Sequence, residues 1–218
     1  MENEDNHIEE LHLCYNNIKA ITPHAKWNKL KLLNLEENQI SDFSECLKTV
    51  KEYFPSLTKL ILSRNPVDNF IIEENSVGPQ DFVSISSVSL NNTKIKNWET
   101  IDLLNEIFPE LKEIRLSNIE LFKDVSPLHQ RYFIISRFYH LNRLNGSEIS
   151  AKDREDAEKY YLAYLYERFQ TFQADSPEQI EFKNKNKRFN ELLKKYGVPS
   201  LSGSKDEPQS LSSSMLSS

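Results

Sequence analysis

Aliphatic residues recur in a fixed frame along the first two thirds of the chain. Five stretches fit the pattern L-x-x-L-x-L-x-x-N-x-L with aliphatic substitutions, and they start at Ile8, Leu30, Leu57, Ile85 and Leu111. These starts lie 22, 27, 28 and 26 residues apart. The two leucines of L-x-L point to the same side of a short strand, and the residues beside them point to the other side. Five matches in order predict a coil of short strands around one shared core.

An asparagine follows the strand pattern in the first three stretches, as Asn16, Asn38 and Asn65. A side-chain amide both donates and accepts, so we expect these residues to bond main-chain groups of their own turn and of the next. We therefore interpret them as a structural asparagine ladder. Thr93 takes the same place in the fourth stretch and can supply part of this bonding, whereas Ile119 in the fifth cannot. The coil is expected to change shape there.

Helical patterns lie between some of the strands. "CLKTVKEYFPSL" from Cys46 and "LLNEIFPEL" from Leu103 have apolar residues at helical spacing, and each ends in Phe-Pro. Pro55 and Pro109 are expected to end these helices. Period and pattern together are typical of leucine-rich repeats. The expected fold is an α/β solenoid with short parallel concave strands, convex helices and a C-terminal helical cap.

The end of the repeats is marked by a turn and a charged helix. Phe138, Leu141 and Leu144 are expected to keep a vestige of the repeat frame, 27 residues after Leu111, with a turn at Asn145-Gly146. In this frame Leu141 takes the place of Ile114. A helix from Ser150 then places one set of residues on an apolar face and another on a polar face. The apolar set is Ala157, Tyr161, Tyr164, Leu165, Phe169 and Phe172, and the polar set is Asp156, Glu158, Lys159, Glu167 and Arg168. The expected domains are 1–146 (about five repeats plus a degenerate terminal one), 147–175 (helical cap) and 176–218 (a linker with a short helix and a disordered Ser-rich tail).

Composition excludes several classes of function. The net charge is −6, which does not favour nucleic acid or an anionic membrane as partner. With 4 Gly the chain contains no phosphate-binding loop motif, and Cys14 and Cys46 form no spaced pair. The five histidines lack metal-ligand spacing. We expect no catalytic set, no metal site, no cofactor and no membrane segment.

The outward positions of the strands form the candidate partner-binding surface. Leu32 and Ile61 are apolar at outward positions on adjacent strands and are possible anchors for a partner, although isolated surface aliphatics are common. Glu10 and Glu36 stand opposite Lys59 and Arg115, which suggests a polarised face or, equally, an ordinary mixed surface. The predicted partner-binding residues are His12, Leu32, Asn34, Glu36, Lys59, Ile61, Ser63, Ser89, Asn91, Glu113 and Arg115.

Several stretches resemble one known family. "RYFIISRFYHLNRLNGSEISAKDREDAEKYYLAYL" (131–165) resembles the C-terminal cap of intracellular leucine-rich repeat proteins. "RFNELLKKYGVP" (188–199), "IEELHLCYNNI" and "FPSLTKLILSRNPV" are similar to stretches of the tubulin-folding cofactor E and cofactor E-like family. With 4 Gly the chain is expected to lack that family's CAP-Gly module, and the segment after Pro199 to be too short for its ubiquitin-like domain. The chain is therefore expected to be either a fragment or a shortened member of the family.

The resemblance implies a non-enzymatic, cytoplasmic and cytoskeleton-associated chaperone module. Its implied role is post-chaperonin tubulin folding, dimer dissociation or turnover. Its implied partners are the alpha subunit of tubulin and other tubulin-folding cofactors. A basic run at 183–188 is interpreted as a solvated helix start rather than a contact for the acidic tails of tubulin. The alternative is a general leucine-rich repeat adaptor, of the phosphatase-regulator or ciliary-scaffold type.

Overall fold

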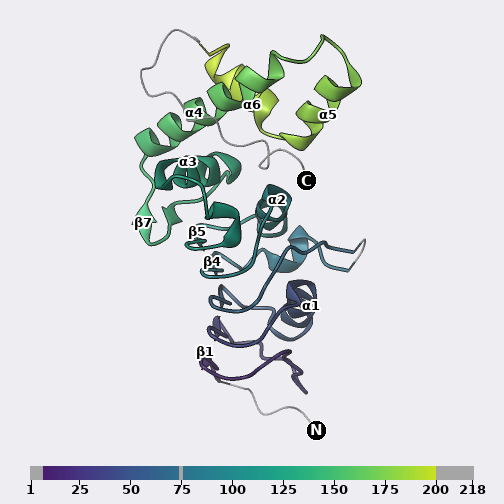
Figure 1. Cartoon of the computed structure of the whole chain (residues 1–218). Helices are drawn as coiled ribbons and strands as arrows, with labels where there is room; N and C mark the ends of the chain where they lie inside the picture. The colour runs from purple at the N-terminus through teal and green to yellow at the C-terminus, as the bar shows by residue number, and fades with distance from the viewer. Residues whose placement is uncertain (1–6, 74–75, 200–218) are drawn as a thin grey trace. The chain divides into compact units, whose positions relative to one another are not determined.

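The computed structural model describes residues 7–73 and 76–199 (Figure 1). The chain divides into two compact units. The first runs to Arg131 and adds Phe138–Ser150, and the second consists of Tyr132–Arg137 with the chain from Ala151 onward. Helix α3 (Pro127–Arg137) contributes residues to both. The Ser-rich tail that was expected to be disordered, at 200–218, lies outside the described residues.

The first unit is built on one sheet. In the described part of the chain the sheet has seven strands in chain order, all parallel except the last pair, which is antiparallel. The strands are β1 (Glu10–His12), β2 (Leu32–Asn34), β3 (Lys59–Ile61), β4 (Ser87–Ser89), β5 (Glu113–Arg115), β6 (Arg143–Leu144) and β7 (Ser147–Glu148). The order and direction confirm the predicted solenoid. Figure 1 shows α1 and α2 on one side of this unit and the strands on the other.

The middle residue of each strand forms the core layer. Register pairs Leu11 with Leu33 and Leu33 with Leu60, and the series continues to Leu144. From Leu33 to Ile114 these side chains are completely buried. Burial of a leucine-sized side chain contributes about 1.5–3 kcal/mol. The alternation seen in the sequence therefore places the outward residues of every strand on a single face.

Each repeat leaves its strand through a residue in the left-handed conformation. These residues are Tyr15, Glu37, Arg64, Asn92 and Asn118, with φ between 54° and 59°. The amide of Tyr15 donates to Glu36 O at 3.0 Å, and the amide of Glu37 donates to Ser63 O at 2.9 Å. Positive φ is unfavourable for residues such as these, so the inter-repeat hydrogen bonds offset a local cost.

The asparagine ladder is visible in the hydrogen bonds of two repeats. Nδ2 of Asn38 donates to Leu13 O in the preceding repeat at 2.9 Å and to Leu35 O in its own at 3.0 Å. Nδ2 of Asn65 likewise reaches Leu35 O at 2.8 Å and Leu62 O at 3.0 Å.

The other three repeats differ from this arrangement. Nδ2 of Asn16 donates to carbonyls of its own turn, those of Leu13 and Cys14, at 3.0 and 2.9 Å. The hydroxyl of Thr93 donates to Leu90 O at 2.9 Å, within its own repeat. Ile119 is buried instead, and the parallel strand pairing continues past it. The expected change of shape at Ile119 is therefore not seen in the strand ladder.

Two helices lie between strands of the first unit, α1 (Phe43–Tyr53) and α2 (Trp98–Ile107). Asp42 and Asn97 cap them, and each side chain accepts a hydrogen bond from an amide in the first turn. The C-cap residues are Phe54 and Phe108, which stand immediately before Pro55 and Pro109. The helices therefore end at the prolines, as predicted. Two short 3-10 helices, η1 (Pro79–Phe82) and η2 (Glu120–Phe122), occupy equivalent connections.

The sheet ends in a hairpin. Leu144, rather than Leu141, aligns with Ile114, so the frame of the last repeat lies three residues later than predicted. Asn145 and Gly146 have φ of 53° and 84°, the signs of a type I′ turn, and they connect β6 to antiparallel β7. The turn predicted at Asn145-Gly146 is confirmed. The register differs because a longer connection, carrying α3, precedes β6.

The second unit is helical: α4 (Ala151–Phe169), α5 (Pro177–Lys185) and α6 (Phe189–Tyr196). The stretch 176–199, expected to be a linker with one short helix, therefore holds two helices, and α6 packs on α4. Ala157, Tyr161 and Leu165 of the predicted apolar face are buried. Glu158 was expected on the polar face, but its exposed fraction is 1%. Its partners, described below, account for this difference.

Candidate protein-binding surface

The outward residues of β1 to β5 form two columns, which we call the strand face. The register aligns the first residue of each strand with the first of the next, and the third with the third. The first column is Glu10, Leu32, Lys59, Ser87 and Glu113, and the second is His12, Asn34, Ile61, Ser89 and Arg115. The structure thus brings most of the predicted partner-binding residues onto one surface.

The two predicted anchors are diagonal neighbours on the strand face. Leu32 aligns with Lys59, and Ile61 aligns with Asn34. Strand spacing and rise place their Cα atoms on the order of 8 Å apart. Both side chains are half-buried. They form a small apolar patch flanked by Lys59 and Asn34, which suits a partner residue of similar size.

Some predicted binding residues are buried or hydrogen-bonded within the repeats themselves. Ser63 and Ser89 are each only 4% exposed. Oγ of Ser63 accepts from the amide of Asn91 at 3.2 Å, and Oδ1 of Asn91 accepts from the amide of Ser117 at 2.8 Å. The sequence frame gives the direction of a side chain but not what covers it, so these two serines do not offer surface to a partner.

The charges of the strand face are locally paired. Nε of Arg115 lies 3.3 Å from Glu113 Oε1, and Nε of Arg64 lies 3.6 Å from Glu36 Oε1. Nε2 of His12 lies 3.3 Å from Glu10 Oε2. Acidic and basic groups therefore alternate over short distances, and this arrangement is closer to the mixed surface than to the polarised one.

The described residues provide no grouped set for metal chemistry. Within 7–73 and 76–199, no three His, Cys, Asp or Glu side chains gather where they could hold a metal ion. No helix in that part is long and apolar enough to span a bilayer. Burial, with a smaller effect of the nearby Asp42 charge, raises the pKa of the Cys46 thiol to about 12, so it is an unreactive core thiol.

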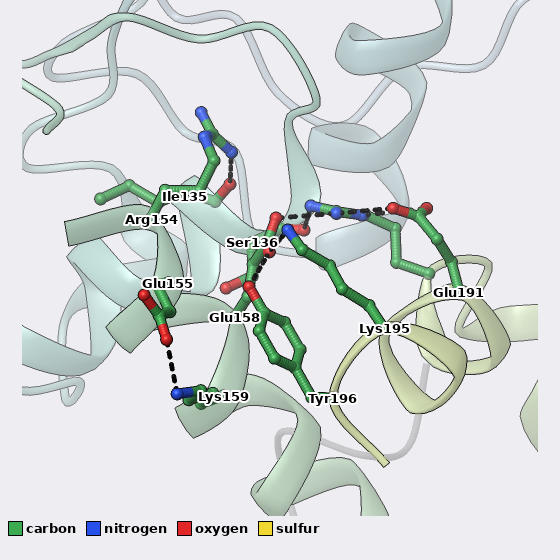
Figure 2. A network of polar contacts seen from close by, with 10 residues as sticks. Ile135, Ser136, Arg154, Glu155, Glu158, Lys159, Glu191, Lys195 and Tyr196 are labelled. Atoms are coloured by element: carbon green, nitrogen blue, oxygen red, sulfur yellow. Dashed lines mark hydrogen bonds and ion pairs between the residues drawn. The ribbon is translucent and has the colours of Figure 1, made fainter. Parts of the chain in front are cut away.

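A second polar site, missed by sequence reasoning, lies in the helical unit. We call Glu158, Arg188, Lys195 and Tyr196 the Glu158 cluster (Figure 2). Oε1 of Glu158 accepts from Arg188 Nη2 at 2.8 Å, and its Oε2 accepts from Lys195 Nζ and Tyr196 Oη, both at 2.7 Å. The side chains of Glu158 and Arg188 are 2% and 7% exposed. The buried carboxylate therefore joins α4 to the start and the end of α6.

Arg188 extends the Glu158 cluster in two directions. Its Nη1 donates to the carbonyl of Ser136, and its Nη2 lies 2.9 Å from Glu191 Oε1. Burial alone would raise the pKa of Glu158, but hydrogen bonds from Lys195, Tyr196 and Arg188 outweigh it and lower the pKa overall. Glu158 is thus held as a buried, fully bonded carboxylate.

The Glu158 cluster accounts for the residues at the end of the described chain. Arg188 belongs to the basic run at 183–188, and it is buried rather than solvated. Lys195 and Tyr196 bond Glu158, and Gly197 ends α6 with φ 75° and ψ −171°, a conformation essentially restricted to glycine. Lys195 and Tyr196 therefore hold α6 against α4, and Gly197 ends the helix.

Repeats of this length, with their parallel strands and left-handed turns, define a leucine-rich repeat protein, and the leucine rich repeat family model matches residues 6–67. The chain is homologous to the tubulin-folding cofactor E and cofactor E-like proteins over most of its length. It is 33% identical over 192 residues to the tubulin-specific chaperone cofactor E-like protein of Homo sapiens, covering 87% of this chain and 42% of that one. It is 32% identical over 222 residues to tubulin-folding cofactor E of Arabidopsis thaliana, covering 96% and 40%.

The chain thus spans about two fifths of the length of these two relatives. Among solved structures, a chain of the SNF/U2A′ complex of Drosophila melanogaster has a TM-score of 0.47 and 17% identity, with 81% of this chain and 87% of that one covered. A likeness of this size carries no argument about function.

Proposed function

We propose that the chain is a non-enzymatic tubulin-binding module that acts in tubulin folding, dimer dissociation or turnover in the cytoplasm. The observation that carries the proposal is its 33% identity over 192 residues to a protein named as a tubulin-specific chaperone cofactor. That alignment includes most of the chain, so the repeats are part of what the two proteins share. The Lys195–Gly197 ending supports the same assignment.

The strand face is the proposed site for tubulin, and the alpha subunit is the proposed ligand. The face offers the Leu32–Ile61 patch with polar groups around it, which is the usual anatomy of a protein interface. Binding there would be non-covalent. The module would change the association of the tubulin dimer only through different affinities for its free and paired states. Other tubulin-folding cofactors would then act on the same complex.

The experiment measures binding of purified tubulin dimer to the immobilised chain. Leu32→Glu/Ile61→Glu places two carboxylates in the apolar patch, and we expect affinity to fall at least about tenfold, which corresponds to about 1.4 kcal/mol. The matched control is Val83→Glu/Leu128→Glu, since those side chains are 51% and 55% exposed and lie away from the strand face. The control is expected to bind like the wild type.

Each outcome has one meaning. No binding of tubulin by the wild type, under conditions where the chain is folded, sinks the proposal. Equal loss in both double variants, or no loss in either, removes the strand face as the site. Cross-linking and mass spectrometry then assign the subunit, and cross-links confined to beta-tubulin contradict the alpha assignment. Retrieval of a phosphatase catalytic subunit without tubulin would favour the adaptor alternative.

A further inference from the structure

The two ends of the sheet are finished differently. At one end, the hairpin places antiparallel β7 beside β6. At the other end, β1 pairs with β2, and in the part of the chain that the structure describes no strand pairs with its outer edge (Figure 1). An unpaired strand edge is a template for pairing with another chain.

The core layer of the first repeat is exposed where later layers are closed. Leu33 and Leu35 are completely buried, while the equivalent Leu11 and Leu13 are half-buried. Tyr15, beside them, is 69% exposed. This end of the first unit therefore presents an apolar surface next to a strand edge.

The main-chain groups at this edge have the geometry of an interior repeat. In the second repeat, Asn34 O accepts from Leu13 N at 2.8 Å, and Glu36 O accepts from Tyr15 N at 3.0 Å. The equivalent acceptors in the first repeat are the carbonyls of His12 and Cys14. By the same register, both main-chain groups of Glu10 and of His12 point outward.

We propose that this edge pairs with a second copy of the chain, β1 against β1 in antiparallel register centred on Leu11. In an antiparallel pair, residues whose N–H and C=O both point outward face each other. This register places Glu10 of each copy opposite His12 of the other, with the two Leu11 side chains between them. Centring the pair on Glu10 would place two carboxylates opposite each other, which is unfavourable, and centring it on His12 would leave the Glu10 carboxylates without an imidazole opposite them.

The test is the mass of the purified chain by sedimentation velocity and light scattering over a wide range of protein concentration. We expect a reversible shift from the 25.5 kDa monomer to twice that mass. His12→Glu is expected to weaken dimerisation about tenfold, because it places two carboxylates opposite one another twice. Glu10→Lys is expected to weaken it as well, because it replaces the hydrogen-bond acceptor opposite His12 by a donor. The double variant Glu10→Lys/His12→Glu restores opposite charges and is expected to restore dimerisation.

The matched controls are Glu113→Lys and Arg115→Glu. They introduce the same residues, Lys and Glu, two positions apart on β5, an interior strand whose Arg115 and Glu113 are also 3.3 Å apart. They are expected to dimerise like the wild type. A wild-type monomer at every concentration overturns the proposal. So does a dimer that responds equally to the β5 variants, or a folded double swap that stays monomeric.

Discussion

The two units of the molecule solve the problem of burying polar groups in opposite ways. In the repeat unit, Asn38 and Asn65 satisfy main-chain carbonyls, and almost the same bonds recur from one turn to the next. In the helical unit, one carboxylate, Glu158, gathers three side-chain donors that lie 30 to 38 residues away in the chain. Stability is therefore distributed in the first unit and concentrated in the second.

The difference can be measured because both tryptophans, Trp27 and Trp98, lie in the repeat unit. Tryptophan fluorescence thus follows the repeat unit, and hydrogen exchange of α6 amides follows the helical one. Substitutions that act on one unit are expected to move one of these signals more than the other. The size of the shift then reports how concentrated the stabilising contacts are.

Removing the central carboxylate is expected to have the largest effect. Glu158→Ala leaves Arg188 buried without its main counter-charge, and breaking a buried pair in this way costs about 3–5 kcal/mol. Hydrogen exchange in α6 should accelerate accordingly, while the fluorescence midpoint in denaturant moves less. Glu155→Ala is the matched control, because Glu155 lies on the same helix in an exposed pair with Lys159. If the α6 amides exchange as slowly in Glu158→Ala as in the wild type, the stability of the helical unit is not concentrated in the Glu158 cluster.

A single rung of the asparagine ladder comes next. Asn65→Ala leaves the carbonyls of Leu35, Leu62 and Ser63 and the amide of Ile40 one hydrogen bond short in a buried site. The expected loss is about 2–3 kcal/mol in the fluorescence transition. Asn16→Ala, at an exposed rung, is expected to cost less than about 1 kcal/mol. Equal losses at the two positions would show that burial does not set the value of a rung.

The glycine that ends α6 should have a smaller effect. Gly197→Ala is expected to cost about 1–2 kcal/mol, because φ of 75° is unfavourable for any residue with a Cβ. The added methyl group meets nothing within 4 Å, so the cost is conformational. Gly78→Ala is the control, since Gly78 has φ of −147° and equally open surroundings. Hydrogen exchange of the last turn of α6 measures the change, and equal effects at both glycines would argue against it.

The subtlest test uses pH. Since the pKa of Glu158 is lowered in the folded state, its contribution is present above the unfolded pKa of about 4.3 and is lost as pH falls through the lower folded value. Protection of α6 should therefore weaken on acidification in that window. Glu158→Gln should remove this part of the pH dependence. If the protection of α6 in this variant falls with pH as steeply as in the wild type, Glu158 is not the group responsible.

The repeat unit was predictable because its information is local and periodic. Leu33, Leu60 and Asn65 occur at fixed places in a frame that repeats, and each contact partner is one period away. Leu144 takes the place predicted for Leu141, three residues earlier, because the connection before it, which carries α3, is longer. Ser63 and Ser89 show a second limit: the period gives a side chain's direction but not its exposure.

The helical unit was less predictable because its decisive contacts are neither local nor periodic. Glu158 lies in a run of charged residues, and helical spacing predicted that it lies with Lys159 on the solvent-exposed face. Its partner Arg188 is the N-cap of a different helix, α6, and lies inside a basic run that was interpreted as solvated. Arg188 and Lys195 lie at helical spacing on the same face as Leu192, which is buried. This pattern was the available signal, because a charged side chain beside a buried leucine requires a partner.

The left-handed residue that follows each of the first five strands has a practical consequence for protein engineering. Every repeat there passes the chain on in the same backbone conformation, whether the residue is Tyr15, Glu37, Arg64, Asn92 or Asn118. The side chain at this position varies freely while the backbone does not. Each such residue is therefore a natural splice point, at which one turn of the coil can be exchanged for another as a cassette.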